Sequence, residues 1–157
     1  MNFKNSKIFS IIEKSIKNIE KDSSAIIGTK LKIADCSSEK YCWFLRLYNK
    51  SGHYLDMHFD NNFTKGKRYT YVLNLYTSEC NSSHFISKSK NKMNIFRSNT
   101  GNGVVYNGSS VKHAISTQTT NCTRISLIIP LYENYKLSIL GSIRAHARNI
   151  TYKLLGL

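Results

Sequence analysis

The chain has 157 residues, of which 41% are hydrophobic, and this is enough for one domain with a buried core. No apolar run is long enough to span a membrane. Residues 1–21 carry lysine and glutamate throughout, unlike a secretory signal. We therefore expect a cytoplasmic protein that does not enter a membrane. Its cysteines lack zinc-type spacing, and we expect free thiols at Cys36, Cys42, Cys80 and Cys122.

The formal net charge of +14 permits attraction to nucleic acid, to an anionic membrane surface or to an acidic substrate. The lysines are dispersed along the chain and do not form one block. A biased amino-acid composition explains such a distribution equally well. Nucleic acid is therefore a possible partner but not the favoured one.

An amphipathic helix is predicted over residues 6–21, where isoleucines recur at helical spacing. Asn5 or Ser6 would cap it. Its polar face mixes Glu13 and Glu20 with lysines, which favours a helix packed on a core over one lying on a membrane. The isoleucines are Ile8, Ile12, Ile16 and Ile19. A strand is expected over Ala25–Ala34 and a polar loop over residues 35–40.

Short β runs separated by turn residues follow from Tyr41 to Leu131. This spacing predicts a mostly β fold, a sandwich or jelly-roll barrel with flanking helices. Pro130 is expected to end the last strand, and an apolar stripe predicts a helix over residues 133–155. Strands are expected near 42–48, 54–59, 67–76, 84–87, 93–97, 103–106, 111–116 and 122–130. The single domain of residues 1–157 would comprise an N-terminal helix and strand (1–40), a β core (41–131) and a C-terminal helix (132–157).

His58 and Asp60 stand two residues apart at the end of a predicted strand, so their side chains would project from the same face. A third ligand would complete the two-histidine, one-carboxylate arrangement that holds Fe(II) and leaves coordination positions open. Taken alone, His-x-Asp is a weak signal, because it also fits a surface pair at a strand end.

A second group of residues lies downstream and strengthens this interpretation. His113 falls in one predicted strand, and Arg124 and Ser126 share a face of the next. A guanidinium and a hydroxyl together suit a carboxylate. Arg124 precedes the apolar run 125–129, and a cation that faces inward there needs a partner.

In these positions the chain resembles the Fe(II)/2-oxoglutarate-dependent dioxygenases, whose signature is His-x-Asp, then some fifty residues, then His, then ten residues, then Arg-x-Ser. The matching residues here are His58-x-Asp60, His113 and Arg124-x-Ser126. The resemblance covers about residues 42–131. Tyr48, ten residues before His58, matches a position where members of the prolyl-hydroxylase-like branch place a tyrosine on the cosubstrate. A packed core aromatic is an equally good interpretation of Tyr48.

The resemblance implies a cupin-like double-stranded β-helix with iron held by His58, Asp60 and His113. The far carboxylate of 2-oxoglutarate would meet Arg124 and Ser126, with Tyr48 in support. The implied reaction consumes O2 and 2-oxoglutarate, releases succinate and CO2, and hydroxylates a substrate C–H bond, with ascorbate as a possible supporting reductant.

The chain departs from the family in its short N-terminal part and at Asn74, where prolyl-hydroxylase-like members often have a second cosubstrate tyrosine. Its short loops resemble that branch more than the larger members. A peptidyl side chain or a small amino-acid-like molecule is therefore the expected substrate. The alternative is a non-catalytic jelly-roll module whose basic surface binds nucleic acid or an acidic partner.

Overall fold

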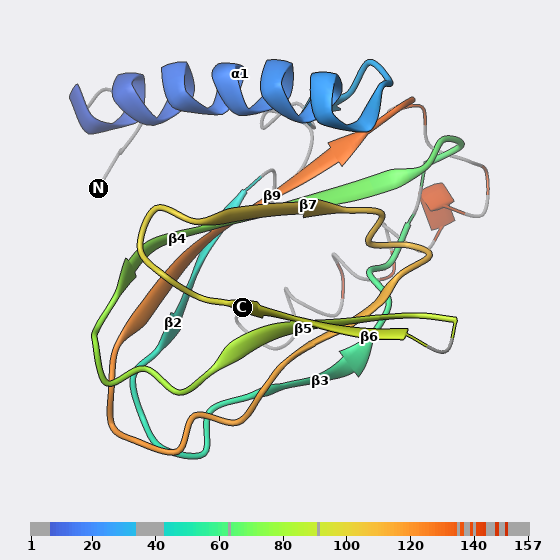
Figure 1. The fold of residues 1–157 in the computed structure, drawn as a ribbon. Coiled ribbons are helices and arrows are strands. Elements are labelled where there is room, and N and C mark those ends of the chain that lie inside the picture. Colours follow the sequence, from blue (N-terminus) through green and yellow to red (C-terminus); the bar gives the residue numbers. More distant parts are fainter. Residues whose placement is uncertain are drawn as a thin grey trace.

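The computed structural model describes residues 7–33, 43–62, 64–90, 92–134, 136, 139, 141–143, 147 and 150. Within them lie one long helix and nine strands (Figure 1). Their bounds are α1 Lys7–Ile27, β1 Lys32–Ile33, β2 Phe44–Tyr48, β3 Leu55–His58, β4 Arg68–Thr77, β5 His84–Ser89, β6 Lys92–Arg97, β7 Gly103–Tyr106, β8 Lys112–Ile115 and β9 Arg124–Tyr132. The eight strands expected between residues 42 and 130 are all present, with ends that differ from the predicted ones by at most two residues.

Strands β2 to β9 form two antiparallel sheets that face each other. One sheet has the order β2-β9-β4-β7, with β1 also paired to β9, and the other has the order β3-β8-β5-β6. Along the chain, β2, β4, β7 and β9 belong to the first sheet, while β3, β5, β6 and β8 belong to the second. This strand order is that of a double-stranded β-helix, or jelly-roll, and it confirms the predicted fold.

Strand β9 lies in the middle of the first sheet, and its two faces serve different purposes. Leu127, Ile129 and Leu131 pack with Ile16 of α1 in the hydrophobic core, so the helix covers the outer face of the sheet (Figure 1). On the opposite face, Arg124, Ser126 and Ile128 line a cavity between the sheets. Side chains alternate along a strand. Because the residues from Leu127 to Leu131 on one face are buried against α1, Arg124 and Ser126 on the other face point into the barrel.

Helix α1 is longer at its carboxyl end than expected. It continues to Ile27, and Gly28 then adopts a positive φ of 73°. The amides of Gly28 and Thr29 both donate to the carbonyl of Ser24, which is how many helices end at a glycine. The strand predicted over Ala25–Ala34 is therefore wrong, since only Lys32–Ile33 pair with β9. The predicted cap at residues 5–6 lies outside the described residues.

Pro130 does not end the last strand, which continues to Tyr132. Proline removes a donor from the hydrogen-bond ladder, so it is tolerated where a neighbouring strand is missing. The pairing of β2 with β9 ends at Ile128, and that of β1 begins at Leu131. Among the described residues, neither β1 nor β2 pairs with Pro130.

Cys80 and Cys122 form a disulfide, so the prediction of free thiols is wrong for this pair. The bond joins the segment after β4 to the segment before β9. The spacing of the cysteines in the sequence does not predict this bond, because the two residues are 42 positions apart and meet only in the folded barrel. Cys36 and Cys42 lie outside the described residues. Disulfides are typical of oxidising compartments, so this bond does not support the expected cytoplasmic location. That location stays a prediction.

Most of the helix predicted over residues 133–155 lies outside the described residues. The few positions described after Lys136 have helical backbone: 139, 141–143, 147 and 150. Among the described residues, no helix has the length and apolar character needed to cross a membrane.

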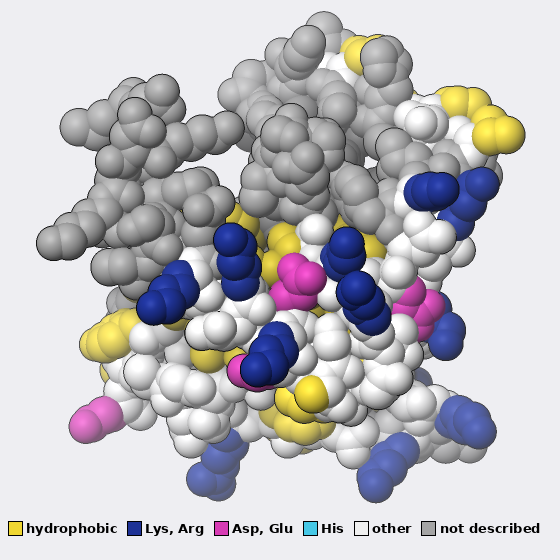
Figure 2. Space-filling model, turned by 90° about the horizontal axis from the view of Figure 1, so that it is seen from above, with side chains coloured by type: hydrophobic (Ala, Val, Ile, Leu, Met, Phe, Trp, Pro, Cys, Tyr) yellow, Lys and Arg dark blue, Asp and Glu magenta, His cyan; other side chains and the backbone are white. Residues whose placement is uncertain are grey.

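Basic side chains are spread over the face above α1 and are interspersed with acidic ones (Figure 2). Among the described residues of the helix, Lys14, Lys17 and Lys21 are exposed, and the acidic Asp22 is exposed beside them. This face therefore carries the dispersed charge that the sequence indicated. The described residues of this face do not form a single basic patch.

Candidate metal centre and anion site

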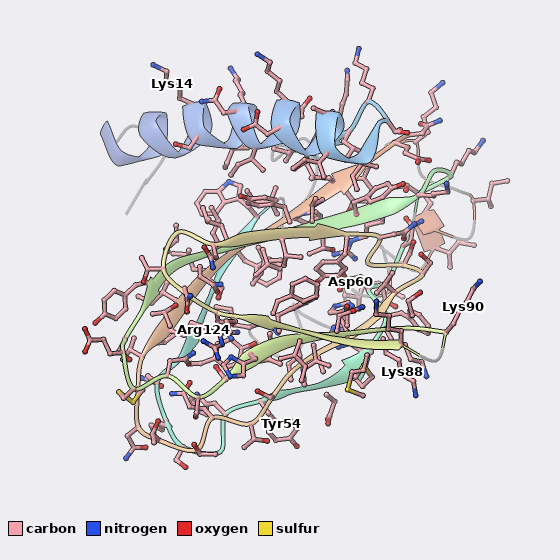
Figure 3. The ribbon with its side chains drawn as sticks, viewed as in Figure 1. Lys14, Tyr54, Asp60, Lys88, Lys90 and Arg124 are labelled. Atoms are coloured by element: carbon pink, nitrogen blue, oxygen red, sulfur yellow. A yellow bond between two sulfur atoms is a disulfide. The ribbon has the colours of Figure 1, made fainter. Side chains whose placement is uncertain are left out.

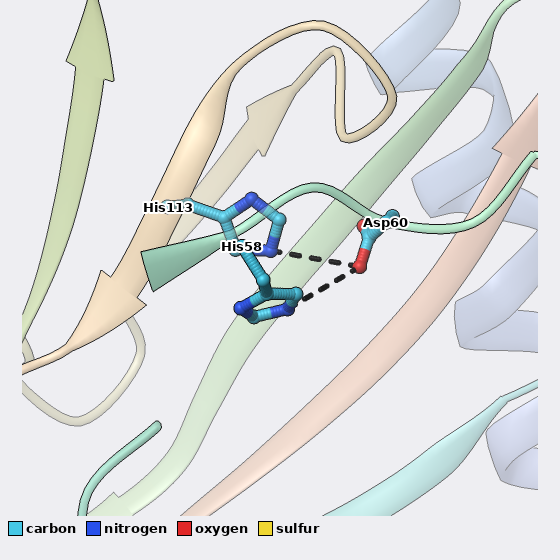
Figure 4. Close-up of side chains that lie close together, drawn as sticks. All are labelled: His58, Asp60 and His113. Atoms are coloured by element: carbon cyan, nitrogen blue, oxygen red, sulfur yellow. Dashed lines mark ion pairs between the residues drawn. The ribbon is translucent and has the colours of Figure 1, made fainter. Parts of the chain in front are cut away.

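His58, Asp60 and His113 come together between the two sheets (Figure 4). His58 is the last residue of β3 and lies directly opposite His113 of β8, with ring centres 4.3 Å apart. Asp60 follows two residues after His58, beyond the strand end, where its amide donates to the carbonyl of Gly108. The three residues thus converge because a cross-strand pair meets the chain leaving β3.

The donor atoms of the three side chains surround one point. Asp60 Oδ1 lies 3.8 Å from His58 Nε2 and 3.5 Å from His113 Nε2. All three donor atoms lie within 4.8 Å of one another. His113 is almost fully buried, while His58 and Asp60 are partly exposed. The site is therefore anchored on one side and accessible on the other.

Backbone carbonyls select which ring nitrogen of each histidine carries a proton. His58 Nδ1 lies 2.6 Å from the carbonyl oxygen of Asp56, and His113 Nδ1 lies 3.0 Å from that of Val111. A carbonyl only accepts, so each Nδ1 is the donor and each neutral ring keeps its lone pair on Nε2. Both Nε2 atoms face Asp60, which is the orientation a metal ligand requires.

The carboxylate of Asp60 is held by three groups on neighbouring elements. The Thr70 hydroxyl hydrogen-bonds to Oδ2, and the guanidinium of Arg68 lies 3.9 Å from the same oxygen. Gly108 passes so close that a β-carbon there would overlap Asp60 Oδ2. Oδ1 remains directed at the two histidines.

These contacts keep Asp60 ionised. Burial by itself raises the pKa of a carboxyl group, but contact with His113, the charge of Arg68 and the Thr70 hydroxyl act in the opposite direction. Their sum holds the pKa of Asp60 well below its usual value of 3.8. Two neutral imidazole nitrogens and one carboxylate oxygen form the donor set that suits Fe(II) with open positions. The residues present therefore fit the implied metal.

Arg124 is a buried cation without a carboxylate. Its side chain is 1% exposed, and it makes no ion pair with any described residue. Nη1 donates to the hydroxyls of Ser83 and Ser98, while Nε is buried without a partner. Burial lowers the pKa of Arg124, as it does for any cation removed from water. An anion in the cavity would satisfy both the charge and the free donor.

Tyr48 and Ser126 line the same cavity as Arg124. Tyr48 is buried, and the guanidinium carbon of Arg124 lies 4.4 Å from the centre of its ring. Ser126 is also buried, and its hydroxyl donates to the side-chain oxygen of Asn74 on β4. Asn74 is the residue at which the sequence departs from the resembled branch, and its side chain accepts a hydrogen bond from Ser126.

One cavity joins the two groups of residues. It is lined by His58, Asp60 and His113 at one part and by Tyr48, Arg124 and Ser126 at another. Figure 3 shows Asp60 and Arg124 both lying between the two sheets. All six residues proposed from the sequence therefore line a single space. Their roles as ligands stay predictions.

Several residues of the site carry no recognisable signal in the sequence. Alternation along β4 places Thr70 and Val72 on one face, but their proximity to the site depends on the pairing with β9. The ring of Tyr106 lies tilted against that of His113, with ring centres 4.6 Å apart. Only Gly108, in a turn five residues before His113, offered a local hint. The others not found from the sequence are Arg46, Arg68, Ser83, Phe85 and Ser98.

No family model matches the sequence, and no curated protein matches it. Three solved structures illustrate what the chain is similar to. A prolyl-4-hydroxylase of Pseudomonas putida is 18% identical with a TM-score of 0.47, covering 57% of this chain and 50% of that one. An oxidoreductase of the 2OG-Fe(II) oxygenase family from Burkholderia pseudomallei is 19% identical with a TM-score of 0.47, covering 61% and 50%. A cupin of Desulfovibrio desulfuricans is 14% identical with a TM-score of 0.34, covering 55% and 81%.

The chain spans about half the length of the two oxygenases.

Proposed function

We propose that the protein is an Fe(II)- and 2-oxoglutarate-dependent oxygenase that hydroxylates its substrate. One observation carries the proposal. A single cavity holds a two-histidine, one-carboxylate cluster together with a buried arginine that has no acidic partner among the described residues. A metal ion and a dicarboxylate would satisfy both features at the same time.

The chain's own residues have distinct tasks in this proposal. His58 and His113 present unprotonated Nε2 atoms, and Asp60 presents Oδ1, as ligands for iron. Arg124, oriented by two serine hydroxyls, binds the far carboxylate of 2-oxoglutarate. Tyr48 supports the guanidinium through its ring. Iron bound there supplies the activation of O2 that couples loss of CO2 from 2-oxoglutarate to oxidation of a C–H bond.

The walls of the cavity favour this use. Phe85, Tyr106 and Ile115 lie beside the histidines and limit the entry of water to the bound metal. Exclusion of water strengthens the contacts between Arg124 and a carboxylate. The substrate class is proposed to be a peptidyl side chain or a small amino-acid-like molecule.

The test is formation of succinate from 2-oxoglutarate with Fe(II), O2 and ascorbate, together with equilibrium dialysis of 2-oxoglutarate without oxygen. Wild type is compared with His58→Ala and Arg124→Gln, with His84→Ala and Arg97→Gln as matched controls outside the site. Circular dichroism shows whether each variant folds.

We expect wild type and both control variants to form succinate. We expect His58→Ala and Arg124→Gln to lose this turnover. Loss of 2-oxoglutarate binding should accompany the arginine change. Absence of both turnover and Fe(II)-dependent binding in folded wild type would overturn the proposal.

A further inference from the structure

Arg46 is a second arginine of the same cavity. It lies on β2 between Phe44 and Tyr48, whose side chains share its face, and all three line the space that also contains the histidines. In the register of the sheet it stands opposite Ser126. Leu45 and Leu47 occupy the other face and are exposed. The strand therefore directs a cation into the barrel interior.

The guanidinium of Arg46 has no acidic partner among the residues that the structure describes. Its guanidinium carbon lies 5.7 Å from the centre of the Phe44 ring, and its charge acts on Arg124 and Tyr106 across the cavity. None of the ion pairs or hydrogen bonds among the described residues includes it. Asp60 is the one described carboxylate that lines the cavity, and Arg68 and His113 already contact it. A partly buried cation is costly without a partner, and an anion from outside the chain would supply one for Arg46.

The location of Arg46 connects the cavity with the surface. Strands β2 and β3 are consecutive in the chain but belong to different sheets, and neither pairs with the other. Arg46 lines both the cavity and a surface depression formed with Gly52, His53, Tyr54 and Leu55, and the place where the two adjoin is called the opening. Tyr54 is 57% exposed and lies on the outer side of β3 (Figure 3). Arg124 lines the cavity but not this depression.

The charges around the cavity indicate which anion Arg46 would meet. A divalent metal ion, Arg46, Arg68 and Arg124 are opposed by Asp60 and by a cosubstrate with two carboxylates, so two positive charges are left over. Arg68 already contacts Asp60, and the metal and Arg124 are the partners of the cosubstrate. Arg46 is therefore the described cation of the cavity that lacks an anion.

We propose that Arg46, in the opening between β2 and β3, binds an anionic group of the prime substrate, a carboxylate or a phosphate. This inference rests on the proposed function and assigns the substrate class of that same site. Arg46 is a specificity determinant here: it holds the substrate by its charged end, with the remainder extending toward His58 and His113.

The test uses the full chain loaded with Zn(II), which does not support turnover, and saturated with 2-oxoglutarate. Acetate, methylphosphonate and neutral acetamide are titrated in turn, and backbone amide shifts are followed by nuclear magnetic resonance. Wild type is compared with Arg46→Gln, Arg46→Lys and the surface control Lys14→Gln. The spectra also show whether each variant is folded. Affinity for 2-oxoglutarate is measured separately for every variant.

We expect acetate or methylphosphonate to shift the amides of β2 and of residues 52–55, whereas acetamide does not. The Arg46→Gln change should weaken that binding about ten- to a hundredfold, because a charge-assisted contact is lost, and Arg46→Lys should retain part of it. The anion that binds more tightly distinguishes a carboxylate-bearing from a phosphate-bearing substrate. Affinity for 2-oxoglutarate should change by less than about threefold in Arg46→Gln.

Three results would overturn the inference in distinguishable ways. If 2-oxoglutarate binds but neither anion depends on Arg46, the anion subsite alone is wrong. If Arg46→Gln weakens 2-oxoglutarate binding as strongly as Arg124→Gln, then Arg46 belongs to the cosubstrate site. If wild type does not bind 2-oxoglutarate at all, the proposed function fails and the inference fails with it.

Discussion

Tyr48 and Arg124 are directly opposite each other on β2 and β9, and the guanidinium of the arginine lies over the tyrosine ring. Both residues line the cavity that also contains the histidine cluster. Their position relative to each other is set by the pairing of β2 with β9.

Tyr48→Phe separates the ring of this residue from its hydroxyl. The ring packing under Arg124 is kept, so stability should change little. If the hydroxyl meets the cosubstrate carboxylate, affinity for 2-oxoglutarate should fall about fivefold, as expected for one hydrogen bond. Dialysis of 2-oxoglutarate measures this. Unchanged affinity would assign Tyr48 to packing alone, and Phe44→Leu on the same strand face is the control for a general effect of cavity shape.

Gly108→Ala should damage the metal site without touching a ligand. A methyl group at this position would overlap Asp60 Oδ2 and lie 2.7 Å from Thr70 Oγ1, so the carboxylate must move. Loss of such an outer contact typically lowers metal affinity about 10- to 100-fold. Fe(II) or Zn(II) affinity is measured with a competing chelator. Ser109→Ala, in the same turn, should bind metal like wild type, and equal affinity of Gly108→Ala would contradict the described position of Asp60.

Ser83→Ala combined with Ser98→Ala should release Arg124. Both hydroxyls accept from Nη1, at 3.1 and 3.0 Å. Without them the guanidinium keeps its charge but loses its orientation, and the buried donor is left unsatisfied. We expect 2-oxoglutarate to bind about tenfold more weakly while metal affinity is preserved. The exposed Ser89→Ala on β5 is the matched control. Parallel loss of metal affinity would instead indicate a general disturbance of the barrel.

Replacing both cysteines of the Cys80–Cys122 bond by serine should reduce stability. The bond closes a loop with a sequence separation of 42 residues, and such links typically contribute about 2–4 kcal/mol to the free energy of unfolding. Urea denaturation of the oxidised wild type and the double variant measures the difference. Reductant should lower the stability of wild type toward that of the variant and leave the variant unchanged. Equal stability of the two proteins without reductant would argue against the bond.

Much of the barrel was predictable because its signals are local. Strand alternation and turn residues located all eight barrel strands, and the helical spacing of isoleucines located α1. The prediction was wrong where a local signal was ambiguous. Residues 25–27 have the composition of a strand, yet they extend α1 until Gly28 ends it.

The partners of the site could not be predicted, because each contact joins residues far apart in the sequence. Arg68 and Thr70 reach Asp60 from another strand, and Ser83 and Ser98 reach Arg124 from segments 41 and 26 residues away. Nothing in their own neighbourhoods distinguishes these residues from ordinary strand or loop residues.

Local sequence alone accounts for the strand pattern and for the candidate ligands, since spacing of two along a strand places side chains on one face. Pairing of distant strands accounts for the rest. It sets His58 opposite His113, leaves Arg124 buried without a carboxylate among the described residues, and places the partly buried Arg46 where the cavity adjoins a surface depression. Closure of the barrel brings these groups together, because the burial of one face of β9 against α1 requires the other face to point inward.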